Sequence, residues 1–533
     1  MDFLKNVGVY ATYNELFGNK YSKDKLVNLI SGLPLGGVLM ILSQFNSLPM
    51  NDSKLRSQFF DFLKENGVDI RPIEKRMVLY SKQGLLVVWK WLLSYGDPEK
   101  IKEDILIDSG TNMLLYINLI VSDYSYNEEL TKETLKYDIF RNALFNTNND
   151  VVSSLVRASV MYDEIAKQKT FFESREYIDI NELFIEKYGY SIKEYLAVIF
   201  SLFSAYLKNK SVISPEWNRH HDFFSGVRNP EIANNIIGEL SMSLSEASEW
   251  ARTTLDKPWD FTKFRQKPIL KFDDGKFCTI SLTLLFEQVF SELYFKIRQI
   301  HSNQSTQIIS FFGRIFEKYI EIIAENATSI SRLPYEFIPE FSYGAKRSKK
   351  SPDVLIKLGN KLLAVEAKVY RVKMDSFIGN THATIDSDIN RMAISPIIQL
   401  HNRLKELKDI KHPIMDEIEE IHLMSVTLGN LPTIPPFEKV IESKLSENFE
   451  IPIKGHYHLD VEEFEMMCEL LSRKNSSPIF KYLDNHSKMK TSFKNYMFQS
   501  HLHPRRLKYI DEKFEKQTNE MIRVLFDNDV LEP

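Results

Sequence analysis

Cysteine and glycine are scarce in this sequence. Its 533 residues include only two cysteines, Cys278 and Cys468, and 19 glycines. The two cysteines provide neither a disulfide framework nor the closely spaced pairs of a structural zinc site. The loop that starts at Gly32, GLPLGGVLM, lacks the Gly-Lys-Ser/Thr ending of a phosphate-binding loop. We therefore expect a reducing compartment and no nucleotide site.

Long hydrophobic runs are also missing. The longest largely apolar stretch, Leu196–Leu207, has 12 residues and charged flanks, whereas a membrane-spanning helix needs about 20. The first segment, MDFLKNVGVYATYNELF, lacks the basic, apolar and small-residue regions of a secretory signal. These features predict a cytoplasmic protein with no membrane partner. With 43% hydrophobic residues, the chain can bury a large core and should divide into two or more domains.

Charge is unevenly distributed along the chain. The net charge is -4, but residues 341–410 contain 13 Lys and Arg against 7 Asp and Glu, a local net charge of +6. The densest basic run lies at residues 346–350. Concentrated positive charge favours phosphate groups as partners, although a charge run taken alone is ordinarily a solvated loop.

The stretch SPDVLIKLGNKLLAVEAKVY predicts a β-hairpin with two acids at its open end. Its two apolar runs are joined by Gly359-Asn360, a pair suited to a two-residue turn. Such a turn places Asp353 opposite Glu366. Like charges at a cross-strand pair repel each other, at a Cβ separation of about 4.5 to 5.5 Å. A hard divalent cation would relieve this repulsion, since Mg²⁺ prefers oxygen ligands and takes one or two protein carboxylates.

Three further residues flank this pair of acids in the sequence. Lys368 falls on the same face of the second strand as Glu366, because strand side chains alternate with a period of two. Upstream, GRIFEKYIE carries Glu317 beside the apolar stripe of a helix. Downstream, SPIIQLHNRLKEL predicts a helix with Ser395 as its N-cap and Gln399 in its first turn. The plain alternative is a solvated hairpin between surface helices, and the conjunction of turn, register and preceding acid favours a metal site.

This spacing resembles the PD-(D/E)xK nuclease superfamily, which has the restriction-endonuclease-like fold. In that superfamily an Asp after Pro, and a Glu two residues before a Lys, form the metal site. The matching residues here are Pro352, Asp353, Glu366 and Lys368. The resemblance covers roughly residues 311 to 470, under a third of the chain.

The resemblance implies a set of site residues and a cofactor. The implied catalytic residues are Asp353, Glu366, Lys368, Glu317 and Gln399. Mg²⁺, or Mn²⁺ as a substitute, would be held by Asp353, Glu366, the Ala367 carbonyl and Glu317. The residues that we expect to bind nucleic acid are Lys346, Arg347, Lys349, Lys350, Arg371 and Lys373.

The whole sequence predicts an α+β multidomain protein. Before residue 260, segments such as NPEIANNIIGELSMSLSEASEWA have apolar residues at helical spacing. A hairpin turning at Asp274-Gly275 follows, and then a long helix in LLFEQVFSELYFKIRQI. IHLMSVTLGN and GHYHLDV predict strands, and Asp460 can cap the helix after the second one. To this the resemblance adds a restriction-endonuclease-like α/β core with a mixed central sheet flanked by helices.

Four domains are expected from these patterns. A mostly α-helical domain for sensing, scaffolding or oligomerisation would occupy residues 1–264, followed by a hairpin and helix connector at 265–310. The nuclease domain would occupy residues 311–475 and a helical tail residues 476–533.

These residues and the resemblance predict a Mg²⁺-dependent endonuclease that hydrolyses phosphodiester bonds. DNA is the expected substrate because most of the superfamily cleaves DNA, and RNA is not excluded. A large helical half attached to such a nuclease resembles bacterial restriction and anti-phage defence proteins, so the expected partners include a second copy of the chain, bound through that half, and a further defence subunit. Two alternatives stay open: a catalytically silent nucleic-acid-binding or scaffold protein, and a nuclease subunit of a recombination or transposition complex.

Overall fold

The chain folds into two compact units with an α+β architecture. The computed structural model describes residues 9–48, 53–68, 71, 77–125, 134–147, 149–173, 175–208, 213–300, 306–379 and 382–526. Unit 1 comprises residues 1–130, 189–296 and 521–533. Unit 2 comprises residues 131–188 and 297–520.

This division differs from the expected domain boundaries. Residues 131–188, which we expected in the helical N-terminal domain, belong to the same unit as the C-terminal sheet. Tyr137 and Phe140 explain this, because they join the hydrophobic core that covers the sheet. The units therefore follow long-range packing rather than order along the chain.

Unit 1 is mainly helical. Its described helices are α1 (Tyr13–Phe17), α2 (Lys23–Ser31), α3 (Leu35–Phe45), α4 (Ser53–Glu65), α5 (Lys82–Tyr95), α6 (Ile107–Ser122), α10 (Ile192–Lys208), α11 (Pro230–Glu239), α12 (Leu244–Thr253), α13 (Thr262–Gln266), α14 (Leu282–Glu287) and α15 (Ser291–Arg298), which reaches the boundary with unit 2. Its short strands are β1 (Val9–Tyr10), β2 (Met77–Val78), β3 (Arg219–His220), β4 (Ser241–Ser243), β5 (Ile269–Lys271) and β6 (Lys276–Thr279). β1 pairs with β2, and the other four form a sheet in the order β3-β6-β5-β4.

Local turn and helix predictions in unit 1 have mixed outcomes. The hairpin of β5 and β6 is confirmed, with Gly275 at a φ of 82° in its turn. The predicted helical segment after residue 229 is interrupted, because residues 241–243 form β4 and pair parallel to β5. Ser243 then caps α12, because its hydroxyl accepts a hydrogen bond from the Glu246 amide at 3.1 Å. Serine side chains bond to nearby backbone groups in this way, which favours a helix start over a continuous helix. The expected long helix after β6 is two helices, α14 and α15.

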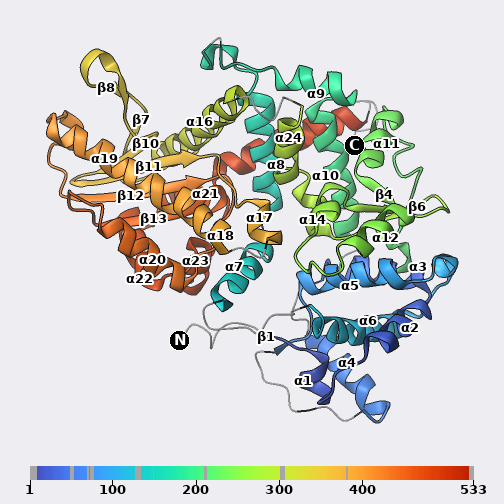
Figure 1. The fold of residues 1–533 in the computed structure, drawn as a ribbon. Coiled ribbons are helices and arrows are strands. Elements are labelled where there is room, and N and C mark those ends of the chain that lie inside the picture. Colours follow the sequence, from blue (N-terminus) through green and yellow to red (C-terminus); the bar gives the residue numbers. More distant parts are fainter. Residues whose placement is uncertain are drawn as a thin grey trace. The chain divides into compact units, whose positions relative to one another are not determined.

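Unit 2 is built around a five-stranded mixed sheet. Its strands are β7 (Glu336–Pro339), β10 (Val354–Leu358), β11 (Lys361–Lys368), β12 (Glu420–Thr427) and β13 (Gly455–Asp460). They lie side by side in the order β13-β12-β11-β10-β7 (Figure 1). β7, β10 and β11 are antiparallel neighbours, whereas β11, β12 and β13 run parallel. The carboxyl ends of these three strands therefore lie at one edge of the sheet, and the two strands predicted in IHLMSVTLGN and GHYHLDV are confirmed.

Helices cover both faces of this sheet. The described helices of unit 2 are α7 (Leu135–Phe145), α8 (Val151–Ser159), α9 (Ile180–Tyr188), α16 (Thr306–Ile330), α17 (Met374–Ile378), α18 (His382–Ile389), α19 (Ser395–Asp409), α20 (Pro435–Ser446), α21 (Val461–Ser472), α22 (Ile479–Met489), α23 (Phe493–Gln499) and α24 (Lys508–Leu525), which reaches the boundary with unit 1. Leu355, Leu362 and Leu423 of the sheet pack against α7, α18, α19 and α20. The other face packs against α16 and α21. A two-stranded ribbon, β8 (Ser342–Tyr343) and β9 (Lys349–Lys350), lies between β7 and β10 in the chain.

A proline shapes the helical path from β11 to β12. The sequence predicts that Ser395 caps a new helix, but α18 continues through a π-helical turn at 390–394 into α19, and Ser395 has helical angles of -58° and -41°. The N-cap prediction is therefore wrong. Pro396 has no amide hydrogen, so the Met392 carbonyl loses its usual helical donor. The Ser425 hydroxyl on β12 donates to that carbonyl at 2.8 Å, which attaches the helix to the sheet.

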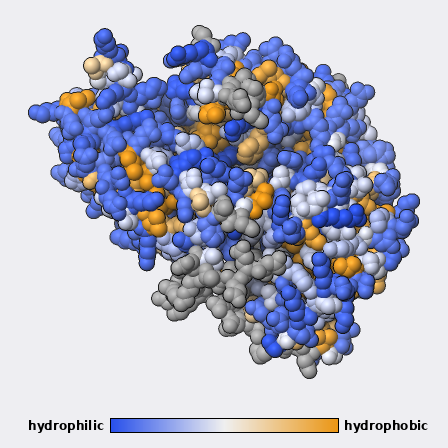
Figure 2. All heavy atoms as spheres, viewed as in Figure 1, coloured by the Kyte–Doolittle hydropathy of each residue, from blue (hydrophilic) through white to orange (hydrophobic). Residues whose placement is uncertain are grey.

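The described surface carries no large hydrophobic face on the side drawn in Figure 2, where hydrophobic residues form small patches among hydrophilic ones. Among the described helices, none is by itself long and apolar enough to cross a membrane. α2 and α3 reach that length and composition only as a pair bent by 105°. Most of α3 is buried within unit 1.

A buried ion pair fastens residues 131–188 to the rest of unit 2. Arg157 on α8 donates to both carboxylate oxygens of Glu465 on α21, at 2.9 and 2.8 Å. The Tyr319 hydroxyl on α16 donates to the same carboxylate at 2.6 Å. All three side chains are buried, so the cost of desolvating the charges is offset only while the pair is complete.

We expect Glu465→Gln to lower the free energy of unfolding by about 3 to 5 kcal/mol, because it leaves Arg157 buried without a counter-ion. The double variant Arg157→Met/Glu465→Leu removes both charges and should recover most of that loss. Urea-induced unfolding followed by circular dichroism measures both. Equal destabilisation by the single and double variants would show that the pair is not the source of the effect.

Candidate active site

The predicted two-residue hairpin turn is confirmed. β10 and β11 pair antiparallel in the expected register, and their ladder ends with Val354 opposite Val365. Gly359 in the turn has a φ of 60°, a conformation that side chains other than glycine rarely adopt. The next position of the register holds Asp353 and Glu366. The turn therefore brings the two acids to the same end of the hairpin.

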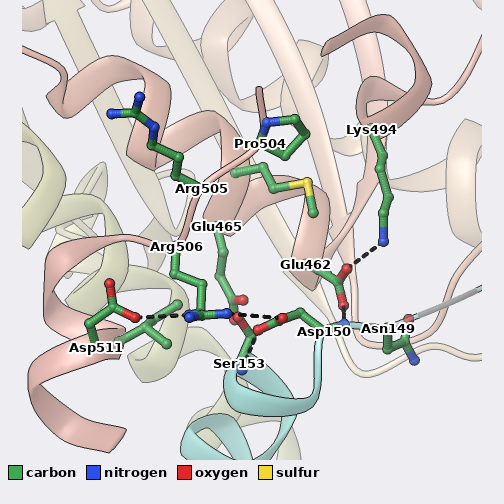
Figure 3. A pocket seen from close by; sticks show the side chains of 12 residues that line it. Asn149, Asp150, Ser153, Glu462, Glu465, Lys494, Pro504, Arg505, Arg506 and Asp511 are labelled. Atoms are coloured by element: carbon green, nitrogen blue, oxygen red, sulfur yellow. Dashed lines mark hydrogen bonds and ion pairs between the residues drawn. The ribbon is translucent and has the colours of Figure 1, made fainter. Parts of the chain in front are cut away.

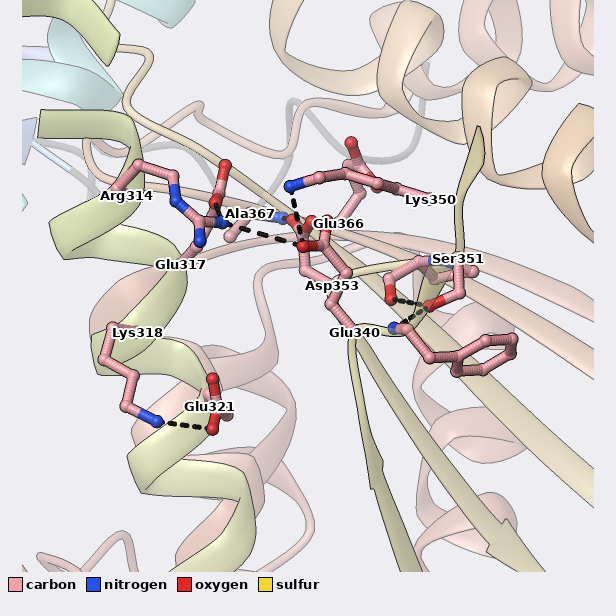
Figure 4. Close-up of polar contacts among 12 residues, drawn as sticks. Arg314, Glu317, Lys318, Glu321, Glu340, Lys350, Ser351, Asp353, Glu366 and Ala367 are labelled. Atoms are coloured by element: carbon pink, nitrogen blue, oxygen red, sulfur yellow. Dashed lines mark hydrogen bonds and ion pairs between the residues drawn. The ribbon is translucent and has the colours of Figure 1, made fainter. Parts of the chain in front are cut away.

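Asp353 is held by hydrogen bonds just before the start of β10 (Figure 4). Its Oδ2 accepts a hydrogen bond from the Ala367 amide at 2.7 Å. Two residues earlier, the Ser351 amide donates to the Phe341 carbonyl, and its hydroxyl accepts from the Phe341 amide, both at 2.9 Å. Pro352 between them fixes its own φ. This segment is therefore a fixed support for the carboxylate rather than a solvated turn.

Two basic side chains bind Glu366. Lys368 Nζ donates to Oε1 and Arg403 Nη1 donates to Oε2, each at 2.6 Å. Glu366 is only 1% exposed, and burying a charge without partners would be costly. Arg403 comes from α19, the helix that covers the Leu362 face of the sheet, so Glu366 and Lys368 lie on the face that the strand period predicts.

Burial and like charge act together on the two acids. Burial raises the pKa of Asp353 well above its usual range, and the negative charges of Glu366 and Glu317 raise it further, against the Ala367 amide and Lys368. Burial also raises the pKa of Glu366, although Lys368 and Arg403 oppose that rise. Burial lowers the pKa of Lys368, but Glu366 outweighs it and leaves the amine pKa raised. Burial is therefore the main cause of both raised carboxyl pKa values, and the neighbouring acids add to it at Asp353.

Glu317 on α16 lies close enough to act on both acids electrostatically. Arg314 on the same helix binds its carboxylate at 3.0 Å and lies 3.6 Å from Glu340. Glu340 in turn binds Lys350 of β9 at 2.9 Å. A chain of alternating charges thus connects the basic ribbon to Glu317, and Figure 4 shows these side chains around Asp353.

The donor chemistry fits one hard divalent cation. Asp353 and Glu366 supply two buried carboxylates at one end of the hairpin, and Mg²⁺ typically takes one or two carboxylates beside water and phosphate. Within the described ranges, no three His, Cys, Asp or Glu side chains converge as a ready-made metal cluster. Arg314 holds Glu317, so the role of Glu317 as a third ligand, like that of the Ala367 carbonyl, stays a prediction.

The other predicted residues occupy two places. Lys346 and Arg347 are exposed between β8 and β9, each with a φ of 54°. Lys349 and Lys350 follow on β9, and each binds a glutamate at 2.9 Å. The basic run therefore forms a ribbon next in sequence to the candidate site, while its contact with nucleic acid stays a prediction.

Three predicted residues follow the end of β11. Arg371 is half-buried and Lys373 is exposed. Gln399 is half-buried in the first turn of α19, and its side chain has no hydrogen-bond partner among the described residues. One turn later on that helix stands Arg403, which sequence reasoning missed. Its only signal was the four-residue spacing from Gln399, which places both on one helix face.

No family model matches the chain, and no curated protein matches it significantly. The candidate site therefore depends on the residues and geometry described above.

Replacing Asp353 by Asn should stabilise the fold, increasingly so as pH rises. A carboxyl whose folded pKa is raised contributes stability at low pH and loses it as pH rises through that pKa. Asn keeps the oxygen that accepts from Ala367 but removes the charge. We expect a higher melting temperature for the variant near pH 8 and no difference near pH 4, about where an ordinary carboxyl titrates. Thermal unfolding between pH 4 and pH 8 measures both melting temperatures, and Asp375→Asn, at an exposed position, is the control. A difference in melting temperature that does not change with pH would contradict the prediction.

Proposed function

We propose that this protein is a Mg²⁺-dependent nuclease that hydrolyses phosphodiester bonds, with DNA as its substrate and a role in restriction or anti-phage defence. One observation carries the proposal: the two buried acids Asp353 and Glu366 meet at the end of one hairpin, with Lys368 bound to Glu366. Perturbed acids of this kind concentrate at functional sites. The order Asp, Glu and Lys is that of the PD-(D/E)xK resemblance.

The topology of unit 2 supports a restriction-endonuclease-like core. A long helix, α16, precedes three antiparallel strands, β7, β10 and β11. A helical crossover through α18 and α19 then leads to β12, which is parallel to β11. The three acids of the site come from α16, the start of β10 and the end of β11, which are the places where the resemblance expects them.

The reaction follows from the roles that these groups would take. Mg²⁺ held by Asp353 and Glu366 would polarise the phosphodiester and lower the pKa of a bound water. Lys368 is fixed by Glu366 and would orient the attacking water and stabilise the negative charge that develops on phosphorus-bound oxygens. Arg403 would keep the Glu366 carboxylate aimed at the site. The bond formed is between the water oxygen and phosphorus, and the P–O bond to the leaving nucleotide breaks.

A catalytically silent protein with the same fold remains the second candidate. The observation in its favour is that Lys368 and Arg403 already occupy both oxygens of Glu366. A protein that uses these contacts only for stability would bind nucleic acid through its basic ribbon without cutting it.

Lys368→Ala and Asp353→Ala should each reduce plasmid cleavage in Mg²⁺ by about a hundredfold or more, as loss of a group that stabilises transition-state charge does. Lys361→Ala is the matched control, because Lys361 begins the same strand and pairs with Glu420 at 2.7 Å. It should cleave like the wild type. Equal cleavage by all three variants would refute the assignment, and no cleavage of any substrate would favour the silent protein.

Arg314→Gln should bind Mn²⁺ about two- to fivefold more tightly than the wild type, since partly exposed ion pairs are worth up to about 1 kcal/mol. The reason is that Arg314 competes with the metal for Glu317. Lys318→Gln makes the same charge change one turn away, where Lys318 pairs with Glu321, and should change affinity less. Calorimetric titration measures the Mn²⁺ affinity of both variants. Equal effects of the two substitutions would show that Glu317 is not a metal ligand.

A further inference from the structure

A polar cavity opens at the carboxyl edge of the parallel strands in unit 2. Its volume is about 400 Å³, within the range of small-ligand sites. Asn430 and Thr433 enter it from the loop after β12, and Asp460 from the end of β13. Asn495 and Phe498 enter from α23. None of these residues belongs to the candidate active site.

The cavity lies beside that site along the sheet edge. In the strand register, Lys368 pairs with Thr427, and Thr427 pairs with Asp460. Neighbouring strands are about 4.8 Å apart, so the backbones of Lys368 and Asp460 are separated by about 10 Å. A polynucleotide with a phosphate at Lys368 would therefore have a neighbouring nucleotide within reach of the cavity.

The cavity offers unused groups that suit the edge of a nucleobase. The side chains of three lining residues, Asn149, Thr433 and Asn495, make no hydrogen bond to any residue in the described part of the chain. Asn430 is different, because it donates to Asp460 at 2.8 Å. Amide side chains provide a donor and an acceptor together, the pattern that reads the edge of adenine.

One aromatic ring at the cavity is exposed to solvent. Phe498 is 57% exposed. It is the one aromatic residue among the exposed large hydrophobic residues in the described part of the chain. An exposed aromatic ring beside polar groups is the arrangement on which unpaired bases stack. The neighbouring aromatic residues of α23, Phe493 and Tyr496, are buried in the unit, so the helix presents only this ring.

The charges of the cavity disfavour a phosphate inside it. Asp460 and Glu462 supply carboxylates, and the nearby Lys494 is paired with Glu462 at 2.8 Å. Burial raises the pKa of the third acid, Glu463, to about 8, so it is mostly uncharged at neutral pH. Carboxylates accept hydrogen bonds from base amino groups but repel phosphate. An uncharged ring with amino groups fits this wall better than an anion does.

A second cavity shares Asn149, Glu462 and Lys494 with the first (Figure 3). Most of its charged groups are paired, since Arg506 binds Asp150 at 3.2 Å and Asp511 at 2.8 Å and Lys494 binds Glu462, and Arg505 alone among its charged lining residues has no ion pair in the described part of the chain. It therefore gives no indication of a ligand comparable with that at the cavity of Phe498.

We propose that the Phe498 cavity binds an unpaired nucleobase of the nucleic-acid substrate, stacked on Phe498 and contacted by Asn149 and Asn495. This rests on the proposed nuclease function and deepens it. The substrate class is then a strand with an unpaired nucleotide close to the phosphate that is cut. The enzyme selects structure rather than a paired recognition sequence.

The test compares two fluorescently labelled duplexes, one fully paired and one with a single unpaired adenosine, bound by the full chain in Ca²⁺. The wild type should bind the second duplex about tenfold more tightly, which is the size of one stacking contact. Phe498→Leu should lose this preference and leave binding of the paired duplex unchanged. Asn495→Ala should weaken the preference as well, and provides a second variant on the exposed face of α23.

Met489→Ala is the control, because Met489 is a 39% exposed apolar residue on the neighbouring helix α22. It should keep the preference. Equal binding of the two duplexes by the wild type, or an unchanged preference in Phe498→Leu, overturns the proposal. Cleavage that depends on Lys368 but not on Phe498 would refute nucleobase binding in the cavity and support the nuclease function. A binding preference that depends on Phe498, without any cleavage, would support nucleobase binding and refute the nuclease function.

Discussion

Two like charges buried at one end of a hairpin are the constraint on which the candidate site depends. Asp353 and Glu366 repel each other away from water, where the repulsion is least screened. The surrounding contacts oppose this repulsion: the Ala367 amide on one acid, and Lys368 and Arg403 on the other. The burial of both acids therefore depends on these contacts, and the proposed nuclease function would give it a use.

The helical crossover between β11 and β12 supplies Arg403, whose positive charge offsets the cost of burying Glu366. Leu400 and Leu404 fix the rotation of α19 on the sheet by entering its core, and Arg403 then faces Glu366. The π-helical turn and Pro396 set where this helix starts along the sheet. The same sheet carries the polar cavity, because Glu366 and Lys368 lie at the end of β11 and Asp460 lies at the end of β13.

Features encoded by neighbouring residues could be predicted from the sequence. The turn at Gly359, the register that it sets and the Asp460 cap, which accepts from the Glu463 amide at 2.8 Å, all depend on a few adjacent positions. Contacts between distant residues could not. Arg403 lies 37 positions from Glu366, and Glu465 lies 308 positions from Arg157. Helical periodicity gives the existence of their helices but not which helices meet, and the two units differ from the four expected domains for the same reason.

The discontinuity of the two units has a consequence for biosynthesis. The chain passes from one unit to the other at residues 130, 188, 296 and 520. A nascent chain emerging from the ribosome therefore cannot form either unit from one contiguous stretch, since unit 1 joins residues 1–130, 189–296 and 521–533, and unit 2 joins residues 131–188 to 297–520. Domains that are contiguous fold in order as they are synthesised. Here each unit is interrupted by the other, so the helices of residues 1–130 can meet those of residues 189–296 only after the intervening segment of unit 2 has been synthesised.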